Sequence, residues 1–167
     1  MTAISLAAGD AHKVKADAIV VGIAQGTGGT LVLAPGARDV DSALKGRLLA
    51  TLTSLGASGK VGECHRVATL GATVSPVVVA VGLGTSPRRG HTFDAETIRR
   101  CAGAATRSLA GTRRVALSLP VGAASGATGI SASGPTAAGN PSTGDGVRAI
   151  AEGALLGNYS YLRYRHA

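Results

Sequence analysis

The sequence predicts an α/β domain in three layers, with a mixed sheet flanked by helices. Continuous apolar runs at residues 16–22 and 76–82 have the length and the β-branched content of strands buried on both faces. Between residues 94 and 109, by contrast, apolar positions recur at the spacing of one helix face. Strands and helices that interleave along one chain are typical of layered α/β folds.

The first third of the chain is expected to contain three strands and one helix. The strands are expected at residues 4–7, 16–22 and 31–33, with a glycine-rich connection at residues 25–30. Asp41 or Ser42 can cap a helix that runs to about Leu55, where Gly56 would stop it.

Two strands, a helix and a further strand are expected in the middle of the chain. Strands at residues 64–70 and 76–82 have a short, turn-like connection, which predicts an antiparallel pair. A double-glycine turn, Gly82-Leu83-Gly84, is expected to end the second of them, and a loop follows at residues 85–92. The helix at residues 94–109 precedes a strand at residues 114–119. Its apolar stripe consists of Ile98, Cys101, Ala102, Ala105 and Leu109.

Residues 120–146 consist almost entirely of Gly, Ala, Ser, Thr and Pro. Such a stretch buries too little apolar area to offset its ordering entropy, so we expect a flexible loop within a single domain spanning residues 1–167. A last helix is expected from Gly146 to about Tyr161. All three tyrosines lie within residues 159–164, at the end of this helix, where a partner could pack. The predicted buried face of this helix consists of Val147, Ile150, Ala151, Ala154, Leu155 and Asn158.

The formal net charge of +8 raises the question of nucleic-acid binding. The basic residues come in scattered pairs and few aromatic residues could stack on bases, so a solvated basic face, or one neutralised by a partner, is the simpler interpretation. DNA binding through that face is kept as an alternative. No run is long enough to span a membrane and no signal peptide is evident, so we expect a cytoplasmic protein.

The sequence offers no residue for a catalytic, cofactor-binding or metal site. Cys64 and Cys101 lie far apart without C-x-x-C spacing, and Cys101 is expected to be a reduced thiol in the core. The glycine-rich segments 26–30 and 82–84 lack the Walker A ending and the helix of a dinucleotide fingerprint, so turn geometry explains them. The histidines are dispersed and have no ligand spacing: His12, His65, His91 and His166.

Three segments together resemble the amino-terminal domain of the cytosol (leucyl) aminopeptidase family, peptidase family M17. They are the strand that ends in the "VGLG" of residues 81–84, the Arg/Ala-rich helix segment of residues 98–105, and residues 152–164. The last segment is similar to the family's "EGxLLGxYxFxxYK", with Tyr161 in place of Phe and Arg165 where the family often has Lys.

The resemblance implies a domain without catalytic residues. Family members bind two divalent metals, Zn or Mn, and hydrolyse peptides with a second domain that carries an "NTDAEGR"-like motif, which this sequence lacks. The amino-terminal domain packs against that catalytic domain and contributes to hexamer assembly. The resemblance therefore implies a catalytic-domain partner and a homo-hexamer, with no cofactor in this chain.

A second resemblance is to the ADP-ribose-binding macro domains. Residues 17–20, Asp-Ala-Ile-Val, are similar to a macro-domain strand that continues into an "NAAN" segment, and the predicted order of elements is macro-domain-like. Residues 21–24, Val-Gly-Ile-Ala, replace the asparagines of that segment here. A macro-like binder of a nucleotide or ADP-ribose is thus a further alternative.

Overall fold

The computed structural model describes residues 3–7, 9–88, 91–122 and 143–159. Five strands form one sheet: β1 (Ala18–Gln25), β2 (Leu31–Leu33), β3 (Cys64–Ala68), β4 (Val77–Thr85) and β5 (Val115–Ser118). The α-helices are α1 (Arg38–Ala43), α2 (Leu48–Ser54), α3 (Ala95–Ser108) and α4 (Thr143–Asn158), and short 3-10 turns lie at Ala11–Lys13 and Thr27–Gly29.

Strand β1 is the centre of the sheet because three other strands pair with it. It pairs in parallel with β4 along its length and with β5 along its first half, while β2 pairs antiparallel with its last residues. Strands β3 and β4 form the expected antiparallel pair, with Cys64 opposite Val81 and Ala68 opposite Val77. The mixed sheet and the α/β class are therefore confirmed.

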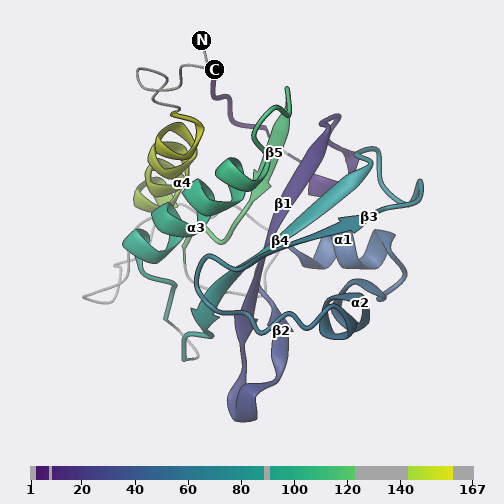
Figure 1. Ribbon diagram of the computed structural model, residues 1–167. Helices are drawn as coiled ribbons and strands as arrows, with labels where there is room; N and C mark the ends of the chain where they lie inside the picture. The colour runs from purple at the N-terminus through teal and green to yellow at the C-terminus, as the bar shows by residue number, and fades with distance from the viewer. Residues whose placement is uncertain (1–2, 8, 89–90, 123–142, 160–167) are drawn as a thin grey trace, which may run out of the picture.

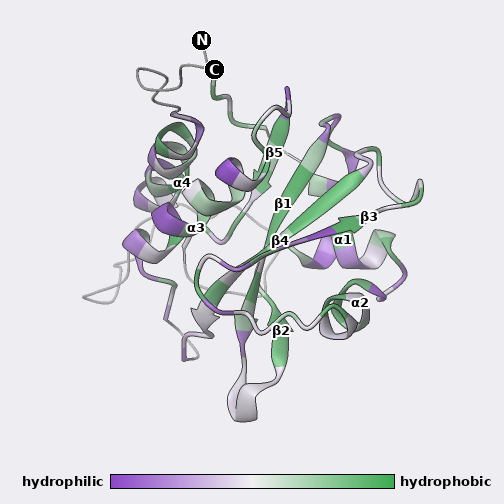
Figure 2. Ribbon diagram, viewed as in Figure 1, coloured by the Kyte–Doolittle hydropathy of each residue, from purple (hydrophilic) through white to green (hydrophobic). Residues whose placement is uncertain are grey.

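Helices cover both faces of the sheet, α3 and α4 on one and α1 and α2 on the other (Figure 1). Because side chains alternate along a strand, β1 supplies both layers of the core. Ala18 and Val20 belong to the cluster under α3 and α4, and Ile19 and Val21 to the cluster under α1 and α2. Figure 2 accordingly shows β1 and β4 as continuous hydrophobic strands between the helical layers.

Helix α3 forms as the apolar spacing predicts. The Asp94 carboxylate accepts hydrogen bonds from the amides of Glu96 and Thr97 at 3.0 and 3.2 Å, which caps the helix. The predicted stripe, from Ile98 to Leu109, is buried in the cluster that also contains Val79 and Val81.

Three predicted elements differ in the structure. The expected helix of residues 41–55 is two helices, since Lys45 and Gly46 adopt positive φ values of 57° and 71° and break it. Asp41 does not cap a helix start but lies inside α1, where its carboxylate accepts a hydrogen bond from the amide of Leu48, the first residue of α2, at 3.0 Å. Residues 4–7 do not form the expected strand: they pair with no strand among the described residues, and the Leu6 side chain is 82% exposed. Strand β4 continues through the expected glycine turn to Thr85.

The last helix begins earlier than predicted, at Thr143, and its buried face matches the predicted one only in part, at Ala154 and Ile150. Its buried residues are Gly146, Ala149, Gly153, Ala154 and Gly157, while Leu155 and Asn158 are exposed. The glycines let α4 approach the backbone of α3, so the contact forms through them and not through the larger residues. Of the expected loop at residues 120–146, residues 123–142 lie outside the described residues. No described helix is both long and apolar enough to cross a membrane.

Candidate functional site

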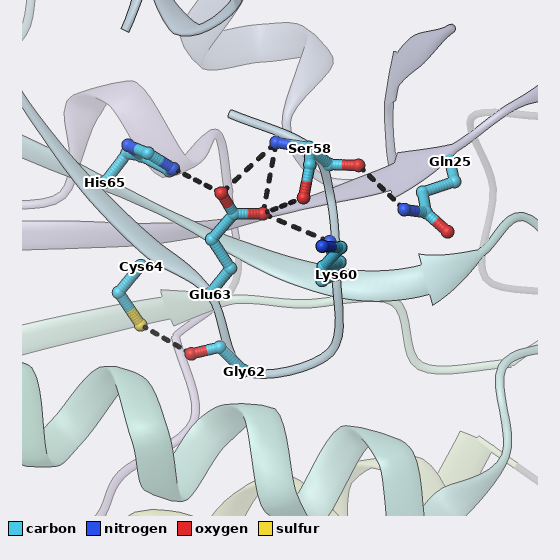
Figure 3. Close-up of polar contacts among 7 residues, drawn as sticks. All are labelled: Gln25, Ser58, Lys60, Gly62, Glu63, Cys64 and His65. Atoms are coloured by element: carbon cyan, nitrogen blue, oxygen red, sulfur yellow. Dashed lines mark hydrogen bonds and ion pairs between the residues drawn. The ribbon is translucent and has the colours of Figure 1, made fainter. Parts of the chain in front are cut away.

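The loop between α2 and β3 carries the densest group of polar contacts, and Glu63 is its centre (Figure 3). The Glu63 carboxylate accepts hydrogen bonds from the Ser58 amide at 3.1 and 3.2 Å, from the Ser58 hydroxyl at 2.8 Å and from the Lys60 amide at 3.1 Å. Nε2 of His65 lies 2.8 Å from the other carboxylate oxygen. The Gln25 side chain joins β1 to this group by donating to the Ser58 carbonyl at 3.0 Å.

These contacts make Glu63 a structural anion and not a catalytic base. Partial burial acts to raise its pKa, but the hydrogen bonds from His65, Ser58 and Lys60 outweigh burial and lower the pKa to about 2. The Ser58 hydroxyl donates to the carboxylate and not to the imidazole. A nucleophilic serine needs the histidine between itself and the acid, so this arrangement does not activate Ser58.

The same loop closes the carboxyl-terminal edge of β1 and β4, where open α/β sheets usually bind ligands. The Gly59 carbonyl accepts a hydrogen bond from the Gly84 amide at 2.9 Å, and the Gly62 amide donates to the Gly82 carbonyl at 2.9 Å. A Cβ atom on Gly82 would collide with the Lys60 carbonyl oxygen. The glycines of residues 82–84 therefore leave room for the loop of residues 59–62 to pack against β4. The hydrogen bonds to this loop also explain why β4 does not end at Gly82.

The two cysteines behave as core thiols. Cys101 is buried, and its Sγ lies 3.1 Å from the Gly82 carbonyl oxygen, while the half-buried Cys64 lies 3.5 Å from that of Gly62. Burial raises the pKa of both thiols, so both are protonated at neutral pH. The prediction of a reduced thiol at Cys101 is confirmed.

The three histidines among the described residues lie on separate parts of the fold. His65 contacts Glu63, His12 lies in the 3-10 turn that precedes β1, His91 lies in the loop before α3, and His166 is outside the described residues. Within the described ranges, no three His, Cys, Asp or Glu side chains gather where they could hold a metal ion.

A second feature is an open hollow of about 530 Å³ at the amino-terminal ends of β1 and β4. Arg66 of β3 and Arg113, from the turn before β5, both line it. Cys64 lies two residues before Arg66 on β3. Burial raises the pKa of its thiol, and a hydrogen bond with Ser108 and then the charges of Arg66 and Arg107 lower it to a smaller extent. In the part of the chain that the structure describes, none of these three arginines forms an ion pair. No motif or spacing in the sequence indicates that residues so far apart converge here.

A third feature is the outer face of α4. Leu155, Leu156 and Tyr159 are 47%, 66% and 73% exposed, respectively, and they follow one another over the last turn and the end of the helix. These three large side chains lie together, which distinguishes them from Leu70, a 95% exposed residue in the β3–β4 turn. Scattered exposed apolar residues are common on protein surfaces, whereas contiguous ones mark contact sites.

The fold and these features define an α/β domain whose sheet edge is closed by its own loop and whose last helix carries an exposed apolar patch. The chain belongs to the cytosol aminopeptidase family, of which it is the N-terminal domain. The model of that domain matches residues 20–134, and the expectation from the three sequence segments is confirmed.

The relatives are several times longer than this chain. A "Probable cytosol aminopeptidase" of Streptomyces coelicolor is 45% identical over 165 residues, which are 99% of this chain and 28% of that protein. A protein of the same description from Micrococcus luteus is 36% identical over 146 residues, which cover 87% of this chain and 24% of its own length. The chain thus spans about a quarter of the length of these relatives.

The same proportion holds for a solved structure. The "Bottromycin maturation enzyme BotP in complex with Mn" superposes with a TM-score of 0.55 at 27% identity. The superposition covers 90% of this chain and 24% of that one. The fold of this chain is therefore similar to that of about a quarter of the longer BotP chain.

Proposed function

We propose that this chain is the non-catalytic amino-terminal domain of a leucyl aminopeptidase, a two-metal exopeptidase that removes N-terminal residues, and that it serves the packing and assembly of the parent enzyme. One observation carries the proposal: 99% of this chain aligns with only 28% of an aminopeptidase relative. The parent enzyme would hold two divalent metals, Zn or Mn, in its catalytic domain, assemble as a homo-hexamer and work in the cytoplasm.

The structure supports this division of labour. Glu63 is the carboxylate at the centre of the polar contacts described above. It accepts hydrogen bonds from four donor groups, and it is ionised at neutral pH. Its neighbour Ser58 is not activated as a nucleophile, so chemistry would belong to the part of the relatives that this chain does not span.

Hydrolysis of leucine p-nitroanilide in the presence of Mn²⁺ or Zn²⁺ tests the proposal. The purified 167-residue chain should release no p-nitroaniline above the metal-only control, while the full-length gene product should release it. An antibody to this domain should reveal a protein several times heavier than 16.4 kDa in the cells that make it. Metal-dependent hydrolysis by the 167-residue chain would overturn the assignment, and a native protein of 16.4 kDa would show that the domain acts alone.

DNA binding is a second candidate, and three exposed arginines favour it. Arg66 and Arg113 line the hollow, and Arg107 lies close enough to Cys64 of β3 to lower its pKa. Arg66, Arg107 and Arg113 are exposed and carry no ion pair within the described residues. If all three contact phosphates, the logarithm of the binding constant for duplex DNA should fall with log salt concentration with a slope of about −3.

Fluorescence anisotropy of a labelled duplex across a salt series measures that slope. Replacing the three arginines by glutamine should flatten it, whereas Arg38→Gln and Arg47→Gln, on the opposite helical layer, should leave it unchanged. An equal loss in both sets of variants would mean that the effect comes from net charge and not from this site.

A nucleotide or ADP-ribose binder, the remaining alternative, gains no support from the geometry. The loop that contains Gly59 and Gly62 lies across the carboxyl-terminal ends of β1 and β4, where such a ligand would be expected. A higher Tm on addition of ADP-ribose would restore this alternative. At a hundredfold excess of ligand over Kd, binding would raise the free energy of unfolding by about 2.7 kcal/mol.

A further inference from the structure

The hollow at the amino-terminal ends of β1 and β4 lies on the α3 face of the sheet. Ala18, Val77 and Leu109 line it, and all three belong to, or pack against, the hydrophobic cluster under α3. Leu109 directly follows the last residue of α3, so the hollow lies where that helix ends. Figure 1 shows the turn between α3 and β5 at the end of the sheet where β1 begins. The hollow is thus bounded by the sheet, by the end of α3 and by this turn.

The inner part of the hollow is apolar and has room for a small molecule. Ala18 and Leu109 are 1% and 5% exposed, so they form the closed side of the lining, and Val77 is partly buried. The volume of about 530 Å³ lies within the range of roughly 300–1,000 Å³ that is common for ligand pockets. Such pockets combine an apolar lining with a few polar groups that orient the ligand. The chemistry of those polar groups therefore indicates the class of ligand.

The polar part of the lining includes two arginines from different elements. Arg66 lies on the same face of β3 as Cys64, because side chains alternate along a strand, and Cys64 packs against the cluster under α3. Arg113 comes from the turn before β5. Both arginines are exposed, and neither forms an ion pair with a described residue. Two guanidinium groups without a carboxylate partner thus line one hollow.

Asp17 also lines the hollow, but its carboxylate bonds to the backbone. It accepts a hydrogen bond from the Arg114 amide at 2.9 Å, and the Asp17 amide donates to the Arg114 carbonyl at 2.9 Å. These bonds hold the turn that carries Arg113 against the start of β1. The charged side chains that line the hollow are therefore two cations and one anion, and the anion already has a partner.

The end of α3 is a simpler reason for cations in this region, because the carboxyl-terminal end of a helix attracts them. The carbonyls of Arg107 and Leu109, however, already accept hydrogen bonds from the amides of Ala110 and Thr112, at 3.2 and 3.0 Å. The turn thus closes the helix end with its own backbone. A helix end also does not account for Arg66, which lies on a strand.

We propose that this hollow binds a small organic anion. Its carboxylate or phosphate group contacts Arg66 and Arg113, and its apolar part lies against Ala18, Val77 and Leu109. A guanidinium group can donate two parallel hydrogen bonds to either kind of head group. This binding role is separate from the packing and assembly of a parent enzyme.

The apolar lining favours such a ligand over duplex DNA. A duplex offers protein side chains its phosphate and sugar oxygens and the edges of its bases. Its backbone has no apolar group to place against Val77 and Leu109, which would stay exposed to water beside the bound phosphates. A small organic anion covers the apolar part of the lining and neutralises the charged part.

Titration of the isotope-labelled 167-residue chain, followed by amide chemical shifts, tests the proposal. The probes are phenyl phosphate and phenylacetate, with phenylacetamide as the uncharged counterpart and inorganic phosphate as the head group alone. At least one of the two organic anions should shift the amides of residues 66–68 and 109–113 to saturation, and the tighter one identifies the head group. Phenylacetamide and inorganic phosphate should each bind about tenfold or more weakly, because each makes only one of the two kinds of contact.

Two double variants with the same net charge test the arginines. Arg66→Gln combined with Arg113→Gln should raise the Kd of the tighter probe about tenfold or more, because both charged donors are lost. Arg38→Gln combined with Arg47→Gln removes the same charge from exposed positions in the helical layer on the other face of the sheet. This control should leave the Kd within about twofold, since solvent and salt screen distant charges.

Ala68 allows a test that keeps both arginines, because it is exposed and lines the hollow. Ala68→Glu places a carboxylate beside the guanidinium groups, where it competes with the ligand. Its Kd should be about fivefold or more above that of Ala68→Gln, which has the same size and no charge. Equal Kd values for the two variants would contradict binding at the arginines.

Several results would overturn the anion site. Shifts that do not saturate, shifts at residues away from the hollow, or equal binding of phenylacetamide would each do so, as would an equal rise in Kd in the two double variants. Failure of both organic anions, together with duplex binding at a salt slope of about −3, would assign the arginines to DNA instead. The anilide assay measures a different property, so none of these results changes the outcome for the proposed function.

Discussion

Glu63 gives order to a loop that has no regular structure of its own. Gly59 and Gly62 adopt φ values of +73° and +79°, so the segment cannot continue as helix or strand, and its amides need other partners. One ionised carboxylate accepts from both Ser58 groups, Lys60 and His65. Charge-assisted hydrogen bonds of this kind are stronger than neutral ones, which explains why a single side chain can hold the loop against the sheet edge.

Glu63→Gln should destabilise the protein in a pH-dependent way. The folded-state pKa of about 2 lies below the reference value of 4.5, so the carboxylate stabilises the fold above about pH 4.5, and this contribution is lost as the pH falls toward 2. A shift of this size corresponds to at most about 3 kcal/mol. Urea unfolding should therefore show a loss of about 2 kcal/mol at pH 7 that shrinks toward pH 2.5.

Asp10→Asn is the matched control for this prediction. Asp10 is an exposed carboxylate whose pKa is lowered by the hydrogen bond that it accepts from Lys13 and by the charge of that lysine. Its substitution should leave the stability profile close to that of the wild type, because solvent screens a surface pair. Equal pH profiles for the wild type and Glu63→Gln would show that the loop does not depend on the carboxylate.

The start of α3 depends on one side chain. Asp94→Ala removes the acceptor for the Glu96 and Thr97 amides and should lower the free energy of unfolding by about 1 kcal/mol. Asp94→Asn, which keeps an acceptor oxygen, should retain most of the stability. Denaturant titration followed by circular dichroism measures both, and an equal loss would mean that charge and not capping is responsible.

At the scale of elements, the pairing of α3 with α4 is the closest contact between helices. Gly153→Ala should destabilise the domain by about 1–3 kcal/mol, because the new methyl group would force α4 away from the Arg99 carbonyl. The gain in helix propensity from Gly to Ala, about 1 kcal/mol, is included in that net value. Leu155→Ala, on the outer face of the same helix, should change the Tm of the 167-residue chain little, and a larger effect there than at Gly153 would contradict the packing described.

The sequence predicts best those elements whose pattern is set by residues close to one another in the chain. The stripe from Ile98 to Leu109 and the strand of residues 31–33 fall where expected. The break at Lys45 and Gly46 escapes prediction, because the apolar spacing on its two sides is compatible with one continuous helix. The predicted buried face of α4 is right at Ala154 and Ile150 but wrong at Leu155 and Asn158. Sequence periodicity favours large side chains at a contact that is in fact made by Gly153 and Gly157.

At the scale of the whole molecule, the candidate sites depend on contacts that are distant in sequence. Gln25 reaches the Ser58 carbonyl across 33 residues, and Arg66 meets Arg113 at the hollow. Neither relation has a periodic or motif signature, so the sequence alone could not locate them. The family resemblance is detectable because residues 81–84, 98–105 and 152–164 carry it locally, and the family match confirms it.

The net charge of +8 should also be visible in the stability of the whole chain. Raising NaCl from about 0.05 to 0.5 M should increase the Tm by a few degrees, because salt screens repulsion between like charges. The variant with glutamine at positions 66, 107 and 113 should respond less, as it has lost three of the unpaired charges. Differential scanning fluorimetry measures the trend, and a Tm that is independent of salt in both proteins would mean that the charges are too far apart to interact.

The glycine contacts between α4 and α3 also set the direction in which the chain leaves the end of α4. Because Gly153 and Gly157 allow no rotation of α4 against its neighbour, the angular phase of the helix at Asn158 is set by the domain. Inserting one residue between Gly157 and Tyr159 would turn the exit of the chain through about 100° and advance it by about 1.5 Å, whereas seven residues would return it to within about 20° of its bearing. An insertion in this segment should therefore be tolerated when its length restores the direction of the chain, as seven residues do, and not simply when it is short.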